Sequence, residues 1–326
     1  MADNMRAAVV TRFGGPEVVE VRDVPRPRPG PGEVLLEVLA SGVNFADVYR
    51  REGRRPGQPP FTLGTECAGR VVEVGAGVGD VALGDLVVTA RSASGTHAQY
   101  AVLAADAVVP VPAGVSAELA AAAILQGMTA HYLAASTFPL QPGHVALVHA
   151  AAGGVGQLLS QLAVARGARV IGVVGAAGKA QPAHHAGAVD VLVQDEVDDL
   201  AAAVRELAPG GVDVVYDGIG QATFEASLAA LRPRGTLALY GMASGPVPPF
   251  DLQRLNSGSL YVTRPALGDY IADRDELLWR AGDVLGGVAD GSLRVSVGGR
   301  YALDDVGRAY AELESRRSTG KLLIVP

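Results

Sequence analysis

The chain of 326 residues has a single cysteine, Cys67. One thiol excludes an intramolecular disulfide and any metal cluster bound by several cysteines, and it fits a reducing compartment. Basic residues are not in excess: 27 Lys and Arg stand against 34 Asp and Glu, and the net charge of −7 argues against a general nucleic-acid-binding protein. No apolar run approaches the roughly 18 residues of a membrane-spanning helix, and the opening residues MADNMRAAVVTRFGG lack the apolar core of a signal peptide. We therefore expect a soluble cytoplasmic protein that needs neither nucleic acid nor a membrane.

What is present is an ordinary globular composition, 49% hydrophobic and 19% charged, with a length that suggests two domains. In the first third, short runs rich in valine and leucine alternate with Gly/Pro clusters, which is typical of a compact all-β unit. One helix is expected within it, at Phe45–Arg51. The expected strands are Met5–Val10, Glu33–Ala40, Arg70–Gly75, Asp85–Ala90 and Gln99–Leu103.

From about Ile124 the pattern changes, and strand-like runs alternate with helical ones. This alternation predicts an α/β domain with a doubly wound parallel sheet and helices on its faces. The expected strands are Val145–His149, Val170–Val174, Val189–Val193, Val212–Tyr216, Thr236–Tyr240 and Leu260–Thr263. The expected helices between them are Val155–Arg166, Lys179–His185, Val197–Leu207 and Thr223–Leu231. The last segment, Asp273–Pro326, contains two helical patterns and a closing strand, Lys321–Val325.

A glycine-rich stretch, LVHAAAGGVGQ, follows the first strand of this alternating region. Its pattern is Ala151-x-Gly153-x-x-Gly156, directly before a helical run, so it lies where a dinucleotide-binding fold holds the pyrophosphate. Small residues allow the backbone to approach phosphate, and the helix N-terminus offers N–H donors. The alternative is a tight turn with a purely structural role. The strand–turn–helix context favours a dinucleotide site.

Lys179 indicates which dinucleotide is bound. An NAD-specific fold has an acidic residue about 20 residues beyond the glycines, at the end of the second strand, where it binds the ribose hydroxyls. Here that strand ends in VVGAAGK, with no carboxylate and with Lys179. An ammonium group there can pair with the 2′-phosphate of NADPH. We therefore predict NADPH, the alternative being that Lys179 is an exposed lysine at the start of a helix.

Several motifs together resemble the medium-chain dehydrogenase/reductase superfamily, and most closely its zinc-free, zeta-crystallin-like quinone oxidoreductases. The resemblance runs along nearly the whole chain. Its motifs are GVNFADVYR (Gly42–Arg50), LGTECAGRVVEVGAGV (Leu63–Val78), AAGGVG, QGMTAHYL (Gln126–Leu133), VVYDGIG (Val214–Gly220), GSLYVTRPAL (Gly258–Leu267), LESR (Leu313–Arg316) and GKLLIVP (Gly320–Pro326). The resemblance implies a GroES-like β domain at residues 1–123 and 267–326, a Rossmann domain at 124–266, and a homodimer.

Two positions support the zinc-free branch by their chemistry. Zinc-dependent members of the superfamily have a cysteine where Asn44 stands and a histidine where Thr65 stands. An amide and a hydroxyl are poor zinc ligands compared with a thiolate and an imidazole. The cysteines of a structural zinc lobe are also absent. We therefore expect no bound metal.

Without a metal, the expected reaction is direct hydride transfer to an electron-poor acceptor such as a quinone, which the protein aligns and shields from water. The resemblance places Asn44, Tyr49 and Arg264 near the nicotinamide and the substrate. Asn44 and Tyr49 can hydrogen-bond an acceptor oxygen, and Tyr49 can also supply a proton. Alternatively, Asn44 caps the helix that begins at Phe45 and Tyr49 lines an apolar wall. Asp47 is expected to be a structural hydrogen-bonding residue rather than a base.

The resemblance also assigns the cofactor contacts. They are Thr129, Gly153, Gly154, Val155, Gly175, Lys179, Gly218, Ile219, Tyr240, Gly241, Met242, Ala243, Arg264 and Lys321. One pair departs from the family pattern: bacterial relatives carry Tyr-Arg after the third strand of this domain, and this chain has Gln194-Asp195. A carboxylate near the 2′-phosphate weakens the preference for NADPH.

Three functions remain open at this point. The first is an NADPH-dependent quinone oxidoreductase. The second is a reductase of enones or similar activated alkenes on the same scaffold. The basic segment Arg50–Phe61 is either a solvated loop or a segment that admits an anionic substrate. The third is a dinucleotide-binding protein with a structural or regulatory role and no catalysis.

Overall fold

The computed structural model describes residues 3–326. The chain forms two compact units: unit 1 holds the chain up to Leu125 together with Asp273–Pro326, and unit 2 is Gln126–Ala272. Helix α2 (Ala117–Tyr132) passes from the first into the second. The expected limits of the dinucleotide-binding domain, 124 and 266, stay a prediction about where the functional division lies. Within residues 3–326, no helix is long and apolar enough to cross a bilayer.

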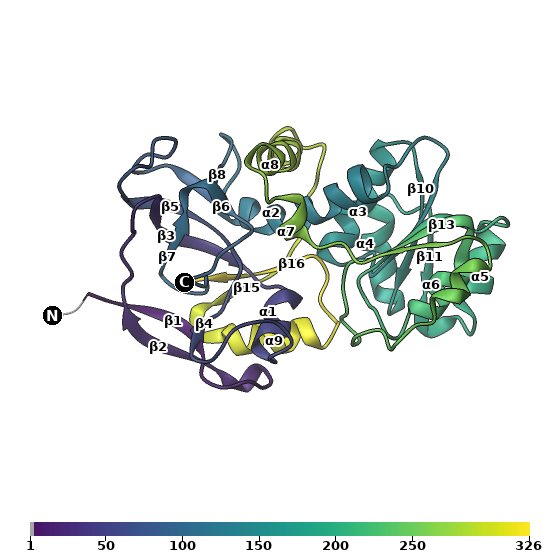
Figure 1. The fold of residues 1–326 in the computed structure, drawn as a ribbon, viewed down its shortest axis with the longest axis horizontal. Helices are drawn as coiled ribbons and strands as arrows, with labels where there is room; N and C mark the ends of the chain where they lie inside the picture. The colour runs from purple at the N-terminus through teal and green to yellow at the C-terminus, as the bar shows by residue number, and fades with distance from the viewer. Residues whose placement is uncertain (1–2) are drawn as a thin grey trace. The chain divides into compact units, whose positions relative to one another are not determined.

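Unit 1 consists mainly of two sheets, built largely from antiparallel pairs (Figure 1). The smaller sheet has the order β2-β1-β4, with β1 at Asn4–Val10, β2 at Val19–Pro25 and β4 at Phe61–Thr62. The larger has the order β15-β16-β3-β5-β6-β8, with β7 also paired to β3. Its strands are β3 (Glu33–Gly42), β5 (Glu66–Val74), β6 (Leu86–Thr89), β7 (Tyr100–Ala104), β8 (Val109–Pro110), β15 (Val297–Ala302) and β16 (Lys321–Val325).

Strands β3, β5 and β16 of the larger sheet come together at the end of β3. Gly42, the last residue of β3, lies opposite Glu66, the first residue of β5, and opposite Leu323 of β16. Helix α1 (Phe45–Arg51) begins just after β3. The other helices of unit 1 are α8 (Arg274–Asp290) and α9 (Val306–Glu314). The strand ends therefore bring residues from distant parts of the sequence beside the start of α1.

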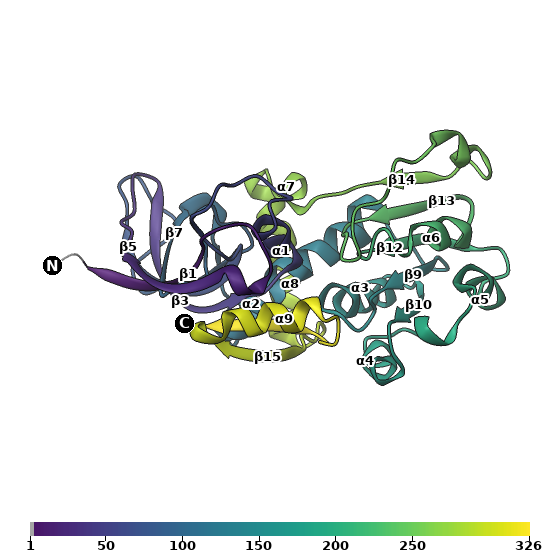
Figure 2. The same ribbon diagram turned by 90° about the horizontal axis from the view of Figure 1, so that it is seen from below.

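Unit 2 contains a six-stranded parallel sheet of order β11-β10-β9-β12-β13-β14 (Figure 2), which confirms the predicted doubly wound fold. Its strands are β9 (Val145–His149), β10 (Arg169–Val174), β11 (Asp190–Val193), β12 (Val212–Asp217), β13 (Leu231–Leu239) and β14 (Tyr261–Thr263). Its helices include α3 (Gly154–Ala165), α4 (Ala180–His185), α5 (Leu200–Leu207), α6 (Phe224–Ala230) and the short α7 (Leu267–Tyr270). One buried core joins α5 and α6 to β9, β10, β12 and β13.

The chain changes direction at β9. It runs outward from β9 through β10 to β11, then returns to place β12 on the other side of β9. In open α/β sheets, ligands bind outside the carboxyl ends of the strands at such a switch point. The expected glycine-rich stretch begins at the carboxyl end of β9, which is therefore where the topology predicts a ligand.

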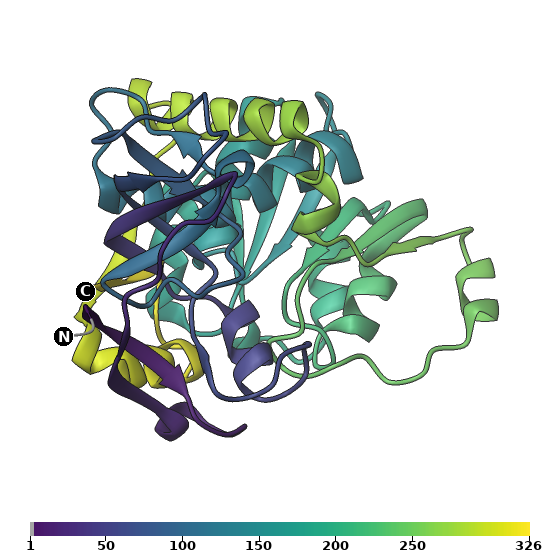
Figure 3. The same ribbon diagram turned by 60° about the vertical axis from the view of Figure 1, so that its left-hand side comes forward.

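β14 lies at one edge of this sheet and is paired with β13. Before it, the chain after β13 runs away from the sheet and returns, as the green segment of Figure 3 shows. This excursion includes a 3₁₀ turn at Leu252–Asn256. The edge strand is thus preceded by an extended, projecting connection.

Candidate functional site

The glycine-rich stretch forms a tight turn from β9 into α3. Ala150 adopts a positive φ of 48°, and Gly153 is the N-cap of α3. A Cβ on Gly156 would lie 2.3 Å from the Ala150 carbonyl oxygen, so the first turn of α3 packs against the end of the strand in a way that only glycine allows. This packing alone accounts for Gly156. The same turn leaves the N-terminus of α3 at the carboxyl edge of the sheet, where an anion would meet unpaired helix N–H groups.

The ends of β10 and β11 carry opposite charges. Val174 and Val193 are paired at the ends of these neighbouring strands. Lys179 ends the 3₁₀ turn that follows β10; it is half-buried, and partial burial lowers the pKa of its ammonium group. Asp195 is exposed in the turn that follows β11. The expected contact for a 2′-phosphate and the expected opposing carboxylate therefore follow adjacent strand ends.

Asp217, the last residue of β12, holds the next loop in place. Its buried carboxylate accepts hydrogen bonds from the backbone N–H of Ile219 (2.7 Å) and Gly220 (3.0 Å) and from the hydroxyls of Thr223 (2.7 Å) and Ser227 (2.9 Å). These bonds fix the loop over Gly218–Gly220. Sequence reasoning did not single out Asp217, although a carboxylate between a buried strand and two glycines is a signal that could have found it.

The loops after β12 and β13 lie against each other. A Cβ on Gly241 would lie 2.3 Å from the Gly218 carbonyl oxygen. Tyr240 donates its N–H to the Asp217 carbonyl at 2.8 Å, and Ala243 donates to the Gly218 carbonyl at 3.2 Å. Two groups of expected cofactor residues, far apart in the sequence, are thereby brought together.

Arg264 follows β14 and reaches back to the same edge. Its Nη1 donates to the carbonyl oxygen of Leu239, the last residue of β13, at 2.8 Å. The guanidinium group therefore lies beside the start of the Tyr240 loop. Among the expected cofactor residues, twelve of the fourteen follow strand ends of unit 2. The two others are Thr129, within α2, and Lys321, in unit 1.

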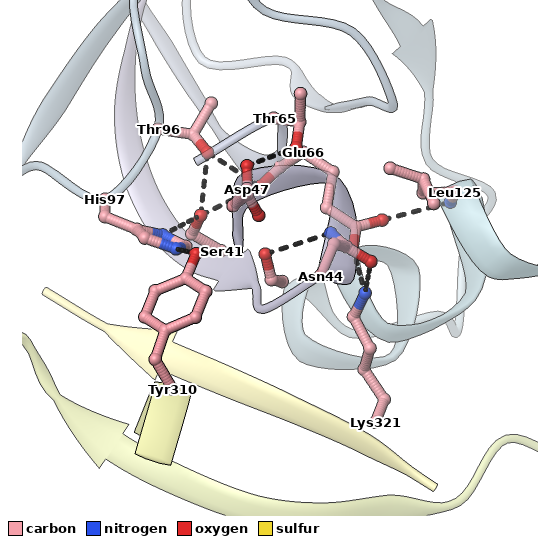
Figure 4. A network of polar contacts seen from close by, with 11 residues as sticks. Ser41, Asn44, Asp47, Thr65, Glu66, Thr96, His97, Leu125, Tyr310 and Lys321 are labelled. Carbon is pink, nitrogen blue, oxygen red and sulfur yellow. Dashed lines mark hydrogen bonds and ion pairs between the residues drawn. The ribbon is translucent and has the colours of Figure 1, made fainter. Parts of the chain in front are cut away.

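In unit 1, Lys321 and Glu66 form a fully buried ion pair (Figure 4). Lys321 Nζ also donates to Asn44 Oδ1 at 2.7 Å. The second carboxylate oxygen of Glu66 accepts from the backbone N–H of Leu125 at 3.0 Å. Lys321 and Glu66 are 255 residues apart in the sequence. The pairing of β3 with β5 and β16 brings them together.

These contacts correct one expectation and bear on another. Lys321 was expected to contact the cofactor; its side chain is directed into the interior of unit 1 and its ammonium is bound by Glu66 and Asn44, and the cofactor contact stays a prediction. Asn44 does occupy the N-cap position of α1, but its side chain makes no capping hydrogen bond. Its amide group donates to the Gly42 carbonyl (3.2 Å) and to Glu66 Oε1 (2.8 Å) instead. The buried charges of Lys321 and Glu66 require hydrogen-bonding partners, and these contacts set the directions of the Lys321 and Asn44 side chains.

Asp47, on α1, is also buried and accepts a hydrogen bond from Thr65 Oγ1 at 2.6 Å. Burial raises the pKa of Asp47 to about 6, and the nearby Thr65, Tyr310 and Lys321 oppose this rise. Its Oδ2 atom has no hydrogen-bond partner among the described residues. Asp47 therefore makes a hydrogen bond through one carboxylate oxygen, and its expected role as a structural residue rather than a base stays a prediction.

Four further polar side chains extend this network and were missed in the sequence. His97 Nε2 lies 2.8 Å from the Tyr310 hydroxyl, and His97 Nδ1 lies 2.7 Å from Ser41 Oγ. Thr96 joins them through the Ser41 hydroxyl at 2.8 Å. Burial, with the charge of Lys321, lowers the pKa of His97 to about 3, so the ring is neutral at pH 7. Nothing in the local pattern marks these residues, because the contacts join distant segments.

Tyr49 lies on the same helix as Asp47 and is buried. Its ring centroid is 6.2 Å from that of Phe45, and the Arg55 guanidinium lies 5.8 Å from the Tyr49 ring centroid. The basic segment after α1 thus has one of its charges beside this phenol ring. Among residues 3–326, no three His, Cys, Asp or Glu side chains are grouped so that they could hold a metal ion.

Two known families match the chain. Residues 30–113 match the alcohol dehydrogenase GroES-like domain, and residues 154–280 match the family described as zinc-binding dehydrogenase. The two matched segments lie mainly in unit 1 and unit 2, respectively.

Similar proteins cover nearly the whole chain. The quinone oxidoreductase of Salmonella typhimurium is 42% identical over 320 residues, 97% of this chain and 98% of its own length. The 2-haloacrylate reductase of a Burkholderia species is 38% identical and covers 98% of each chain. Among solved structures, a mycobacterial protein complexed with NADPH has a TM-score of 0.96 and 46% identity, and it covers 99% of this chain and 100% of its own. Escherichia coli quinone oxidoreductase complexed with NADPH has a TM-score of 0.96 and 41% identity, covering 98% of this chain and 100% of its own.

Proposed function

Because the chain belongs to the zeta-crystallin-like quinone oxidoreductase group of the medium-chain dehydrogenase/reductase superfamily, we propose that it is an NADPH-dependent quinone oxidoreductase. The observation that carries this proposal is the carboxyl edge of the unit 2 sheet, where the loops after the neighbouring parallel strands β9, β10, β12 and β13 all leave the sheet around the switch point. The NADPH complexes of the similar mycobacterial and E. coli proteins support the choice of cofactor.

The residues at this edge fit a dinucleotide. Glycines at the turn into α3 and at positions 218 and 241 place no side chain at this edge, where a pyrophosphate would approach. At Gly156 and Gly241 a Cβ would also clash with the protein's own backbone. Lys179 supplies a positive charge for the 2′-phosphate. Bound nicotinamide would supply the hydride. The residues that we propose to hold the cofactor are Thr129, Gly153, Gly154, Val155, Gly175, Lys179, Gly218, Ile219, Tyr240, Gly241, Met242, Ala243, Arg264 and Lys321.

For the acceptor we propose Asn44, Tyr49 and Arg264 as the catalytic residues. The Tyr49 phenol can donate a hydrogen bond to a quinone oxygen and supply a proton. The Arg264 guanidinium, anchored on the Leu239 carbonyl, can bind an oxygen that gains negative charge. Both donor hydrogens of Asn44 are used inside the protein, so its amide has none to offer a quinone oxygen; the remaining lone pair of Oδ1 can accept only from the O–H of the hydroquinone product.

We propose that the reaction needs no zinc. The Lys321 ammonium already lies against Asn44 Oδ1, and a second cation at that oxygen would be repelled. The amide of Asn44 and the hydroxyl of Thr65 are also poor ligands for zinc.

A second candidate is an activated-alkene reductase. The relationship to a 2-haloacrylate reductase favours it, since that protein's name specifies an alkene conjugated to a carboxylate. The Arg55 guanidinium beside Tyr49 would suit such an anion. A third candidate, a dinucleotide-binding protein without catalysis, predicts cofactor binding and no turnover.

We also propose a cytoplasmic homodimer. The buried, lone thiol of Cys67 fits a reducing compartment. The edge strand β14 exposes Tyr261 and Val262, and Leu252 is exposed in the connection before it. An exposed apolar edge strand is a template for pairing with a second chain.

The deciding experiment is NADPH oxidation by the purified protein with 1,4-benzoquinone in excess chelator, with NADH and a 2-haloacrylate in parallel reactions. We expect turnover of the quinone that survives the chelator and is faster with NADPH. Turnover restricted to the haloacrylate supports the alkene reductase instead. Cofactor binding without turnover of either acceptor contradicts both enzymatic proposals.

A further inference from the structure

Thr65 is the one partly exposed side chain among the polar side chains labelled in Figure 4. The other members of the network lie in the interior of unit 1. They are Ser41, Asn44, Asp47, Glu66, Thr96, His97, Tyr310 and Lys321. Thr65 is therefore the polar member of this network through which the network can reach solvent or a bound molecule.

Asp47, which is hydrogen-bonded to Thr65, has an incompletely paired carboxyl group. It is 2% exposed, and its Oδ1 lies 2.6 Å from Thr65 Oγ1. Its Oδ2 makes no hydrogen bond of regular geometry among the described residues, although the Tyr310 hydroxyl is close enough to lower the pKa of the group. An unpaired carboxylate oxygen in the interior is costly, and protonation of the group removes most of that cost. The groups that face it are the Thr65 and Tyr310 hydroxyls, the Lys321 ammonium and the Glu66 carboxylate.

We propose that Asp47 and Thr65 form a proton relay that supplies the proton consumed when the acceptor is reduced. The inference rests on the proposed function. Reduction of a quinone to a hydroquinone adds one hydride, from the proposed nicotinamide cofactor, and one proton. The Thr65 Oγ1–H bond breaks as the new O–H bond of the acceptor forms. In the protonated carboxyl the 2.6 Å hydrogen bond is reversed, so that Asp47 Oδ1–H donates to Thr65 Oγ1. This proton moves to Oγ1 as the Thr65 proton leaves, so Thr65 stays neutral, Asp47 becomes a carboxylate, and solvent returns a proton to it.

The pH dependence follows from which form of Asp47 is active. Only the protonated carboxyl can supply the proton, and burial raises the pKa of Asp47 to about 6. Turnover should therefore be highest below about pH 6 and fall by about tenfold per pH unit well above it, the limit for loss of one proton. If a tyrosine phenol were the donor instead, the fall would begin near the ordinary tyrosine pKa of about 10.

The test is the pH profile of kcat for quinone reduction in wild type, Thr65→Ser and Thr65→Val. We expect Thr65→Ser to keep the fall in kcat above pH 6. Thr65→Val should lose this fall, and its kcat at pH 6 should be about a hundredfold lower, which is the lower end of general-acid contributions. Thr62→Val is the matched control, because it makes the same change at a partly exposed threonine outside the network. A second readout is the infrared carboxylic-acid band of cofactor-free protein. We expect the band to disappear above pH 6 in wild type and to be absent from Asp47→Asn.

The outcomes separate the relay from the proposed function. Wild type that reduces quinone with a kcat independent of pH between 5 and 9 contradicts the relay and leaves the function intact. Wild type that reduces no acceptor contradicts the proposed function. If Thr65→Val keeps the wild-type pH profile and loses only stability, the Thr65–Asp47 bond is structural and the relay is wrong.

Discussion

At the scale of single residues, the choice of cofactor depends on two opposite charges at the ends of β10 and β11. Lys179 follows β10 and Asp195 follows β11, next to each other in the sheet. A lysine that pairs with a 2′-phosphate makes a charge-assisted hydrogen bond, whereas a nearby carboxylate repels the same phosphate. The net preference for NADPH is therefore the difference between two effects.

Removing the positive charge of Lys179 should show how much it contributes to the preference for NADPH. We expect Lys179→Ala to raise the KM for NADPH by about tenfold to a hundredfold, the equivalent of about 1.5–3 kcal/mol for a hydrogen bond to a charged group. Asp195→Asn should lower the same KM. The KM for NADH, which has no 2′-phosphate, is the internal control in both variants. Equal changes for the two cofactors would show that Lys179 does not contact the 2′-phosphate.

At the scale of elements, Lys321 connects three strands. Its ammonium at the start of β16 meets Glu66 at the start of β5 and Asn44 just beyond the end of β3. Removing one partner of a buried pair leaves the other charge uncompensated, which costs about 3–5 kcal/mol. Replacing both partners by neutral groups avoids that cost.

We therefore expect Lys321→Met to lower the free energy of unfolding by about 3–5 kcal/mol and the double variant Lys321→Met, Glu66→Gln to recover most of it. Urea unfolding measures both changes. Arg300→Met is the matched control, because Arg300 and Glu118 form an exposed pair for which a change under about 1 kcal/mol is expected. An equal loss in Lys321→Met and Arg300→Met would mean that the buried pair contributes no more than the exposed one.

The same elements show what the sequence can predict. The limits of β9 and α1 were predicted as they are observed, because each is marked by its own local pattern. Helix α2 was missed, because its alanine-rich sequence is buried on most sides and so has no polar face. The glycine loop was predicted from neighbouring residues, whereas the Lys321–Glu66 pair joins residues 255 apart and no local pattern indicates it.

At the scale of the whole molecule, the projecting connection and the edge strand β14 should determine the oligomeric state. Tyr261 is 61% exposed and Val262 is 37% exposed, on a strand that is paired with β13 alone within the described residues. If two copies pair along this edge, burying these apolar side chains stabilises the dimer, and charges placed there oppose it.

We expect the wild-type chain to sediment at twice its mass of 33.3 kDa and the double variant Tyr261→Lys, Val262→Lys to sediment as a single chain. The four lysines of a dimer would face one another across the edge, and burying them costs more than the apolar contact contributed. Leu83→Lys is the control, since Leu83 is also exposed but belongs to unit 1 and not to the β14 edge strand. Sedimentation equilibrium over a range of concentrations measures the masses. A dimer that survives both lysines on β14 uses another surface, and a wild-type monomer contradicts the homodimer itself.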